Sequence, residues 1–291
     1  MRHRVLVMTA TLSVLAAFML AGCTAKAHSN TPPPSADQSA SAAPAPSDAG
    51  PSPAASPTPS GPLFTPNAIS LSVKGYWSWS YLDFTTGALS GSSPPNTTSD
   101  TASMAKSWVA ADYLRRAAEK NQTPSSGTMA ELSTMIRDSD NTNAFKYHVA
   151  NGNLSSIQRM IKLCGMTDSK GTNNSWSLTQ MSTRDITRLA KCISDGRAAG
   201  PKWTGWLLNE MRSVRGAGRF GIIEALPAAV AKTTAIKNGW LAREDGQWHI
   251  ACMAIGDTWS IGVMARYPSS LGKDYGAKTC REVTKHLMGQ A

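Results

Sequence analysis

Residues 235–267 read AIKNGWLAREDGQWHIACMAIGDTWSIGVMARY, and their pattern is typical of a β-sheet. It holds three short runs rich in apolar and aromatic residues, at 235–243, 248–256 and 259–267. Turns that contain Asp245-Gly246 and Gly256-Asp257 separate the runs. Short runs divided by turns of this kind predict antiparallel strands joined by hairpins.

A similar pattern occurs near the other end of the domain. Residues 73–84 alternate apolar and polar side chains, and residues 88–92 can pair back on them after a turn. The spacing of apolar residues between the two strand regions predicts helices at 104–120, 128–138, 154–163, 183–194 and 204–213, with a closing helix at 273–289. This order predicts an α+β fold: one antiparallel sheet of about five strands from both chain ends, flanked by helices, with an inserted helical lobe.

The first residues predict export. A short basic head at 2–4 precedes an apolar stretch at 5–19, which is shorter than the roughly 20 residues of a membrane helix. Residues 20–23, Leu-Ala-Gly-Cys, resemble the lipobox of bacterial lipoproteins. The resemblance implies that residues 1–22 are a signal peptide and that Cys23 carries the lipid anchor. The alternative is an ordinary secretory signal with an incidental cysteine.

The segment after the anchor predicts a tether. Residues 23–62 are almost all Ala, Ser, Pro, Thr, Gly and Asp, and so bury too little apolar surface to fold. The folded domain then spans residues 63–291. We expect it to be held on the outer face of the bacterial cell membrane.

Four cysteines remain after Cys23, and an oxidising compartment favours disulfides between them. Four cysteines allow three pairings. Proximity in the sequence favours Cys164–Cys192 and Cys252–Cys280. The alternative is four buried thiols.

The net charge is +10, but the basic residues form no clustered run. We therefore expect these charges to lie on a solvated surface. Outside the cell, we expect the electrostatic partners to be acidic wall polymers and anionic lipids and not nucleic acid. We expect a monomer that needs no cofactor. We also expect no metal site, because the five histidines are scattered along the chain: His3, His28, His148, His249 and His286.

The first candidate for chemistry is Ser103-Met104-Ala105-Lys106, at the opening of a predicted helix. The spacing puts Lys106 one turn above Ser103 on the same face, and a helix N-terminus favours negative charge there. A partly buried lysine can lose its proton near neutral pH and act as base for a hydroxyl. The pattern alone is weak, because residues 270–273 repeat it.

Two further motifs follow. Ser139-Asp140-Asn141 comes after the helix predicted at 128–138, where a hydroxyl and an amide could shuttle a proton and hold a substrate carbonyl. Its alternative interpretation is a helix cap. The third motif lies inside a predicted strand, where a glycine allows close approach of a ligand and a lysine can bind a carboxylate. It reads Lys237-Asn238-Gly239-Trp240, and its alternative is a strand with a bulge.

These motifs, in this order on a helix start, a helix end and a strand, resemble those of the serine β-lactamases and penicillin-binding DD-peptidases. The signature of that superfamily is Ser-x-x-Lys, Ser-x-Asn and Lys-Thr-Gly. The flanking segments 129–142, 182–185 and 221–227 are similar too, and the resemblance covers about residues 70–289. It implies a serine acyl-hydrolase that acts on cell-wall peptides or β-lactams.

The resemblance also implies roles for the reacting groups. Ser103 would be the nucleophile that forms an acyl-enzyme, and Lys106 would be its base. Ser139 would pass a proton to the leaving nitrogen. The backbone N–H groups of Ser103 and Trp240 would form the oxyanion hole, where the loss of one donor typically costs about 3 kcal/mol.

The remaining positions would bind substrate. Asn141 would position the substrate amide, and Lys237 would hold a substrate carboxylate. Asn238, Gly239 and Trp240 would complete the substrate-binding strand.

Two departures from the family pattern bear on activity. Class A β-lactamases carry Glu-x-x-Leu-Asn in the omega loop, where the glutamate activates the deacylating water. Between the second and third motifs the only glutamates are Glu210 and Glu224, and Asp168 is the nearest acid to the expected place. The third motif reads Lys-Asn-Gly, so Asn238 replaces the usual hydroxyl.

The sequence therefore leaves three hypotheses. The favoured one is a serine acyl-hydrolase of the DD-peptidase or weak β-lactamase type. The second is a catalytically degenerate lipoprotein that binds wall material or another ligand on the same fold. The third is an unrelated structural lipoprotein.

Overall fold

The computed structural model describes residues 62–172 and 175–290. The predicted signal peptide, the lipidation site at Cys23 and nearly all of the tether lie outside these residues. No helix within the described ranges is long and apolar enough to cross a membrane.

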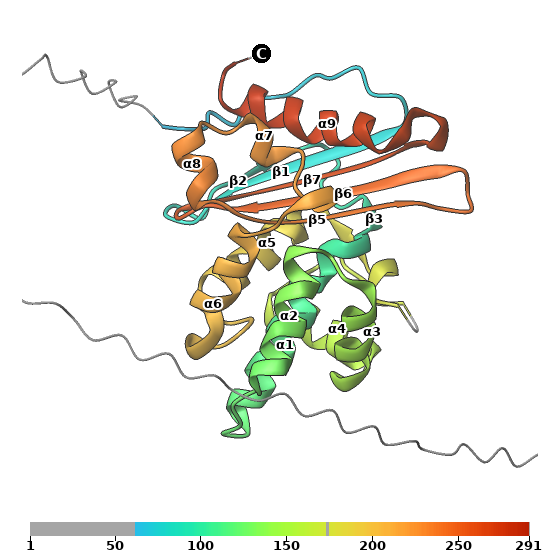
Figure 1. The fold of residues 1–291 in the computed structure, drawn as a ribbon. Coiled ribbons are helices and arrows are strands. Elements are labelled where there is room, and N and C mark those ends of the chain that lie inside the picture. Colours follow the sequence, from blue (N-terminus) through green and yellow to red (C-terminus); the bar gives the residue numbers. More distant parts are fainter. Residues whose placement is uncertain (1–61, 173–174, 291) are drawn as a thin grey trace, which may run out of the picture. The chain divides into compact units, whose positions relative to one another are not determined.

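A five-stranded antiparallel sheet, in the order β2-β1-β7-β6-β5, forms the upper part of the domain in the view of Figure 1. The predicted sheet from both chain ends is therefore confirmed, because β1 pairs along its whole length with β7. The strands are β1 (Tyr76–Asp83), β2 (Leu89–Gly91), β5 (Ala235–Ala242), β6 (Gln247–Ile255) and β7 (Trp259–Pro268).

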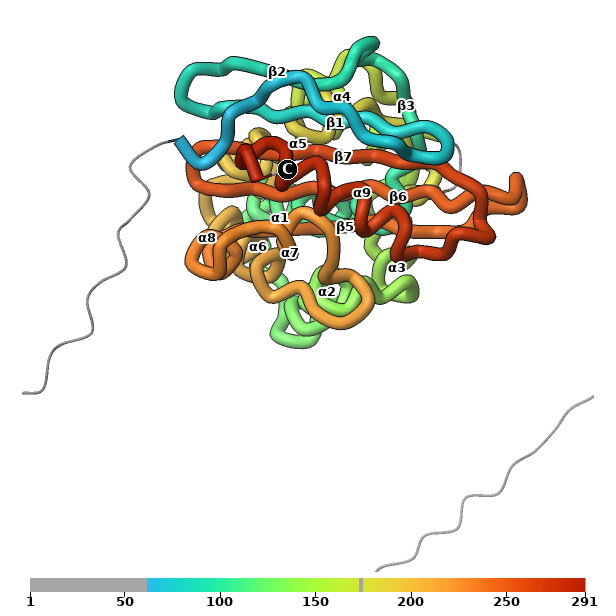
Figure 2. Tube along the Cα trace, turned by 90° about the horizontal axis from the view of Figure 1, so that it is seen from above, coloured from blue at the N-terminus to red at the C-terminus, as the bar shows by residue number. Residues whose placement is uncertain are grey.

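Helices cover both faces of the sheet, which explains why β6 and β7 are nearly continuous apolar runs. On the outer face, α9 (Gly272–Leu287) packs on β6 and β7, with α7 (Ile222–Ala225) beside it. On the inner face, α5 (Thr183–Ser194) packs on β1, β6 and β7. Figure 2 shows α9 lying over the central strands. Strands buried on two sides lose the polar alternation of a half-exposed sheet.

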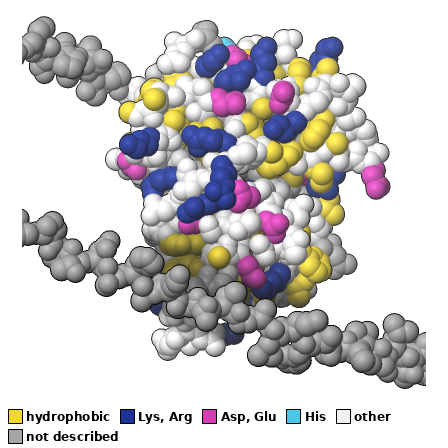
Figure 3. All heavy atoms as spheres, viewed as in Figure 1, with side chains coloured by type: hydrophobic (Ala, Val, Ile, Leu, Met, Phe, Trp, Pro, Cys, Tyr) yellow, Lys and Arg dark blue, Asp and Glu magenta, His cyan; other side chains and the backbone are white. Residues whose placement is uncertain are grey.

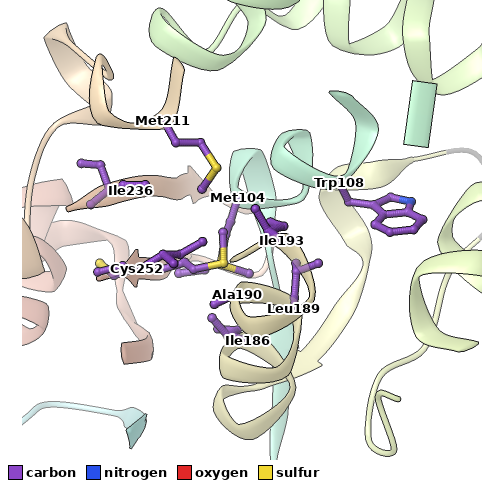
Figure 4. Close-up of a cluster of buried hydrophobic side chains, with 14 of the residues drawn as sticks. Met104, Trp108, Ile186, Leu189, Ala190, Ile193, Met211, Ile236 and Cys252 are labelled. Atoms are coloured by element: carbon purple, nitrogen blue, oxygen red, sulfur yellow. The ribbon is translucent and has the colours of Figure 1, made fainter. Parts of the chain in front are cut away.

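The helical lobe lies below the inner face (Figure 1). Its central helix, α1, contacts α2, α3, α4 and α6, and it is preceded by a short 3-10 turn, η1. Figure 4 shows Met104 and Trp108 on these two elements, together with apolar side chains from α5, α6, β5 and β6. The bounds are η1 (Ala102–Ala105), α1 (Lys106–Glu119), α2 (Ser126–Arg137), α3 (Asn141–Ala150), α4 (Leu154–Leu163) and α6 (Pro201–Arg212).

Several short elements are absent from the sequence-based prediction. The most important is α3, which begins directly at the second motif: Asp140 caps it by accepting a hydrogen bond from the Asn143 backbone N–H, 2.7 Å away. The others have too few residues to show a period. They are β3 (Thr98–Asp100), η2 (Trp176–Leu178), β4 (Gln180–Ser182), η3 (Gly216–Gly218), α8 (Ala228–Thr233) and η4 (Ser269–Leu271), with α7.

The surface agrees with the expectation from composition. On the face in Figure 3, lysine and arginine side chains are spread among acidic and apolar ones and do not form a single patch.

Both disulfides favoured by sequence proximity are present. Cys164–Cys192 joins the end of α4 to α5, and Cys252–Cys280 joins β6 to α9. Gly221 lies against the second bridge with φ +76°, where an added Cβ would come within 2.8 Å of the Cys280 Cβ. The outer helix is thus fastened to the sheet by a covalent bond as well as by packing.

We predict that the double variant Cys252→Ala/Cys280→Ala loses about 3 kcal/mol of unfolding free energy. The bridge closes a loop with a sequence separation of 28 residues, and removing it frees the unfolded chain. Urea unfolding under oxidising conditions measures the loss. An unfolding free energy equal to that of the wild type would contradict the prediction. Cys164→Ala/Cys192→Ala, which removes the other bridge with the same sequence separation, is the matched comparison for the size of the loss.

Candidate active site

Ser103 lies in η1, at the point where strand β5 comes closest to the helical lobe. The approach requires a glycine: a Cβ on Gly239 would lie 2.0 Å from the Thr101 carbonyl oxygen and 2.9 Å from the Ser103 backbone nitrogen. Any larger residue would push the strand away from the serine. The third motif therefore lies against the first, and Ser103 is half-buried between them.

Lys106 begins α1 and is fully buried. Its ammonium group points at the turn between α2 and α3. The Nζ atom lies 2.5 Å from the Ser139 carbonyl oxygen, 2.7 Å from Asn141 Oδ1 and 3.3 Å from Ser139 Oγ. The first and second motifs are thereby joined by one side chain.

Lys237 reaches the same hydroxyl from another element of the fold. It is fully buried on β5, and its Nζ donates to Ser139 Oγ over 2.9 Å. Ser139 has φ +62°, a left-handed backbone conformation that non-glycine residues rarely adopt. One strained serine thus stands between two buried lysines, and all three motifs meet there.

Burial controls the charge of both lysines. It lowers the pKa of Lys106 to about 8, against a smaller opposing effect of Asp140. Burial and then the charge of Lys106 lower the pKa of Lys237 well below its usual value, while Asp138 opposes the shift. Two ammonium groups around one hydroxyl disfavour each other. A neutral amine is therefore accessible near neutral pH.

The Ser103 hydroxyl makes no hydrogen bond to any described residue. Lys106 donates hydrogen bonds to Ser139 and Asn141 instead. Catalytic hydrogen bonds are often loose without substrate and tighten in the complex. The role of Lys106 as base for Ser103 stays a prediction.

Asn141 is exposed at the start of α3, where a substrate can reach it. Asn238 and Trp240 have other neighbours. The Asn238 amide donates to the carbonyls of Gly218 and Phe220, at 3.0 and 2.9 Å. The Trp240 ring meets Phe220 edge-on, with centroids 5.7 Å apart. Both side chains hold the η3 turn, and their contact with substrate stays a prediction.

The repeated Ser-x-x-Lys at residues 270–273 lies elsewhere, on η4 and α9. Lys273 Nζ donates to the Ala217 carbonyl over 3.2 Å and lies 5.1 Å from the Phe220 ring centroid. These contacts give this lysine a packing role and leave Ser103-x-x-Lys106 as the motif at the site.

Comparison with solved structures identifies the architecture. The TLA-3 extended-spectrum β-lactamase matches with a TM-score of 0.61 and 13% sequence identity, over 74% of this chain and 94% of that one. A class A β-lactamase from Mycobacterium abscessus matches with a TM-score of 0.57 and 14% identity, over 73% and 94%. The chain has the β-lactamase fold.

The same fold occurs in PBP-A, which matches with a TM-score of 0.57 and 16% identity over 74% of this chain and 90% of that one. A mutant of PBP-A is known as an acyl-enzyme complex with penicillin G. No family model and no curated protein matches the chain.

The segment that packs on the serine turn lacks a carboxylate. Turn η2 contacts η1, and residues 175–179 read Ser-Trp-Ser-Leu-Thr, which fits the spacing of Glu-x-x-Leu-Asn with Ser175 in place of the glutamate. The sequence analysis did not align this segment with the omega-loop motif, although Leu178 and Thr179 at its end match the spacing of Leu-Asn.

Asp168, the nearest acid by sequence, is already engaged. Arg184 binds both of its oxygens, at 2.6 and 3.0 Å, and Ser182 Oγ donates to it over 2.7 Å. These partners lower the pKa of the Asp168 carboxyl against the effect of burial, which is the largest single influence and raises it. Asp168 therefore holds its loop together. Across the described ranges, no group of three His, Cys, Asp or Glu side chains could hold a metal.

We predict that stability rises with pH because of Lys106. Between a folded pKa of about 8 and the ordinary 10.5, the unfolded chain binds the proton and the folded chain does not. The unfolding free energy therefore increases as pH rises through this range. Lys106→Met should remove about 1–2 kcal/mol of the gain between about pH 7.5 and about pH 9.5.

Urea unfolding at the two pH values measures the effect. The exposed Lys232→Met variant is the matched control and should keep the wild-type gain. If the Lys106→Met variant gains as much as wild type, Lys106 is protonated throughout this range in the folded protein.

Proposed function

We propose that the protein is an exported, lipid-anchored serine enzyme of the β-lactamase and DD-peptidase type. It forms an acyl-enzyme on Ser103 with a cell-wall peptide or a β-lactam. One observation carries the proposal: Ser139 Oγ is bonded to two buried lysines, Lys106 and Lys237, beside a half-buried Ser103. A purely structural role gives no reason to bury two lysine side chains around one hydroxyl.

Each group has a step in acylation. The Ser103 oxygen attacks the substrate carbonyl carbon while neutral Lys106 takes the hydroxyl proton. The negative charge on the carbonyl oxygen is stabilised by the backbone N–H groups of Ser103 and Trp240. Ser139 donates its proton to the leaving nitrogen as the C–N bond breaks, and it is reprotonated from a neighbouring lysine. Lys237 orients the Ser139 hydroxyl and attracts a substrate carboxylate.

The site provides fewer suitable groups for deacylation than for acylation. A water that attacks the acyl-enzyme needs a base, and the η2 segment offers Ser175 where a glutamate would serve. Asp168 is held by Arg184 and Ser182. We therefore expect a long-lived acyl-enzyme, so that the protein retains a penicillin for longer than a β-lactamase would.

The second candidate is a wall- or ligand-binding lipoprotein with a degenerate site. It is favoured by the hydrogen bonds of Lys106, which go to Ser139 and Asn141 and not to Ser103. In that case Ser103→Ala leaves function intact, whereas changes at Lys237 or Trp240 weaken ligand binding.

The proposed location fits the substrates. In this proposal a lipid on Cys23 anchors the chain, and the predicted tether at residues 23–62 separates the domain from the membrane. The domain, expected to be a monomer, can therefore meet wall peptides and incoming β-lactams outside the membrane.

We predict a covalent adduct with penicillin G. Incubation should raise the intact mass of the protein by the mass of one penicillin, because ring opening leaves the whole molecule on Ser103. Ser103→Ala should show no adduct, while Ser107→Ala, a buried serine one turn away, should still react. No adduct on the wild-type protein, or an equal amount of adduct on Ser103→Ala, would contradict the proposal.

We further predict that the acylation rate rises with pH and levels off above about pH 8. Only the neutral amine of Lys106 can accept the serine proton, and its pKa is about 8. Stopped-flow acylation by a chromogenic β-lactam measures the profile. Lys106→Arg keeps the charge but cannot lose its proton, so it should abolish the rise. A flat profile between about pH 6 and about pH 9.5 contradicts this role.

A further inference from the structure

A buried histidine lies between α3 and the η2 segment, and the proposed mechanism does not use it. His148 is on α3 and is 1% exposed. Its ring meets the Trp176 ring of η2 edge-on, with centroids 5.7 Å apart. Neither ring nitrogen has a hydrogen-bond partner among the described residues. Buried polar atoms in proteins nearly always have a partner, so this ring is unusual.

The charges around His148 do not favour a protonated ring. Within the described ranges, the titratable and charged side chains of α1 and α2, the two helices that pack on α3, have other neighbours. These are Lys106 with Asn141, Asp112 and Glu119 with Arg115, Arg116 with the Ala150 carbonyl, Glu131 with Lys146 and Tyr147, Arg137 with Glu210, and the Tyr113 ring with the Tyr147 ring. The η2 segment itself reads Trp-Ser-Leu and carries no charge. Burial lowers the pKa of His148, and no carboxylate opposes the shift.

The η2 segment also supports the turn that carries Ser103. It packs on η1, as described above. The Thr101 backbone N–H donates to the Thr179 carbonyl over 3.0 Å, and Thr101 Oγ1 donates to the Trp176 carbonyl over 3.5 Å. A change in the packing between His148 and Trp176 can therefore reach the serine turn through one short segment.

A proton on His148 is incompatible with this packing. A cation buried without a partner is strongly unfavourable, so the ring either stays neutral or gains contact with water. The η2 segment has three residues, whereas α3 has ten. Separating η2 from α3 breaks less structure than moving the whole helix, and local opening follows the route that breaks least.

We propose that His148 is a positioning residue and an acid-sensitive latch, which holds η2 against α3 and so supports the Ser103 turn. In the neutral form of the ring the segment is closed. In the protonated form the segment separates from α3 and the ring is hydrated. Because the folded pKa lies below the ordinary value of 6.5, the packing is fully present above about pH 6.5 and is lost as the pH falls below it.

Hydrogen–deuterium exchange on the full-length protein tests the latch. The amides to follow lie in residues 175–182, where Thr179 N–H bonds to the Trp176 carbonyl and Gln180 N–H to the Lys170 carbonyl. After correction for intrinsic exchange rates, their protection should be several-fold lower at about pH 5.5 than at about pH 7.5. The limit is about tenfold, because one proton is taken up over one pH unit below the ordinary pKa.

Two variants assign the effect to one ring. His148→Gln keeps a polar side chain that does not titrate, so its protection at the two pH values should agree within about twofold. His286→Gln, on α9, is the matched control and should keep the wild-type response to acid. An NMR titration of the His148 ring in the wild-type protein gives a second measurement that needs no variant. The ring should titrate below its ordinary pKa.

Three results overturn the latch. The first is equal corrected exchange of residues 175–182 at the two pH values. The second is a loss of protection in acid that persists in His148→Gln. The third is a wild-type His148 ring that titrates at its ordinary pKa while the segment stays protected. No substrate enters these measurements, so the latch and the acylation of Ser103 stand or fall separately.

Discussion

The site depends on one interaction, the sharing of the Ser139 hydroxyl by two buried lysines. Lys237 lies 2.9 Å from this oxygen and Lys106 lies 3.3 Å from it. A buried ammonium group without a partner is strongly unfavourable. The turn that carries Ser139 must therefore stay in place, although its φ of +62° is strained. Gly239 completes the arrangement because it lets β5 come close enough to η1 for Lys237 to reach the turn.

The surrounding structure holds that turn from several directions. Arg215 binds both oxygens of Asp138, the residue before Ser139, at 2.6 and 2.8 Å. Asp140, the residue after it, caps α3. Arg137 pairs with Glu210 of α6 over 2.6 Å, which fixes the end of α2. Strain and buried charge at the site are thus offset by ordinary ion pairs and a helix cap around it, a common division between functional and supporting residues.

The sequence predicts the sheet well because its strands are long, apolar and separated by clear turns. It also places the three motifs on a helix start, a helix end and a strand, and their resemblance to a known superfamily implies that they meet; the structure brings Lys106, Ser139 and Lys237 together. It misses α3, because Ser139-Asp140-Asn141 can be interpreted as the end of one helix and is also the start of the next. The partners of Asn238 could not be predicted, because they depend on contacts between segments far apart in the chain. Local patterns carry no information on such distances.

In the proposed mechanism Ser103 is the nucleophile, and Ser139 and the two lysines move and hold the protons that its reaction requires. A crystal structure of the protein after exposure to penicillin G tests it most directly. We expect continuous density from Ser103 Oγ to the opened ring, with the acyl oxygen on the backbone N–H groups of Ser103 and Trp240. Attachment to Ser139 or to either lysine, or an unmodified Ser103 beside an intact ligand, would contradict it.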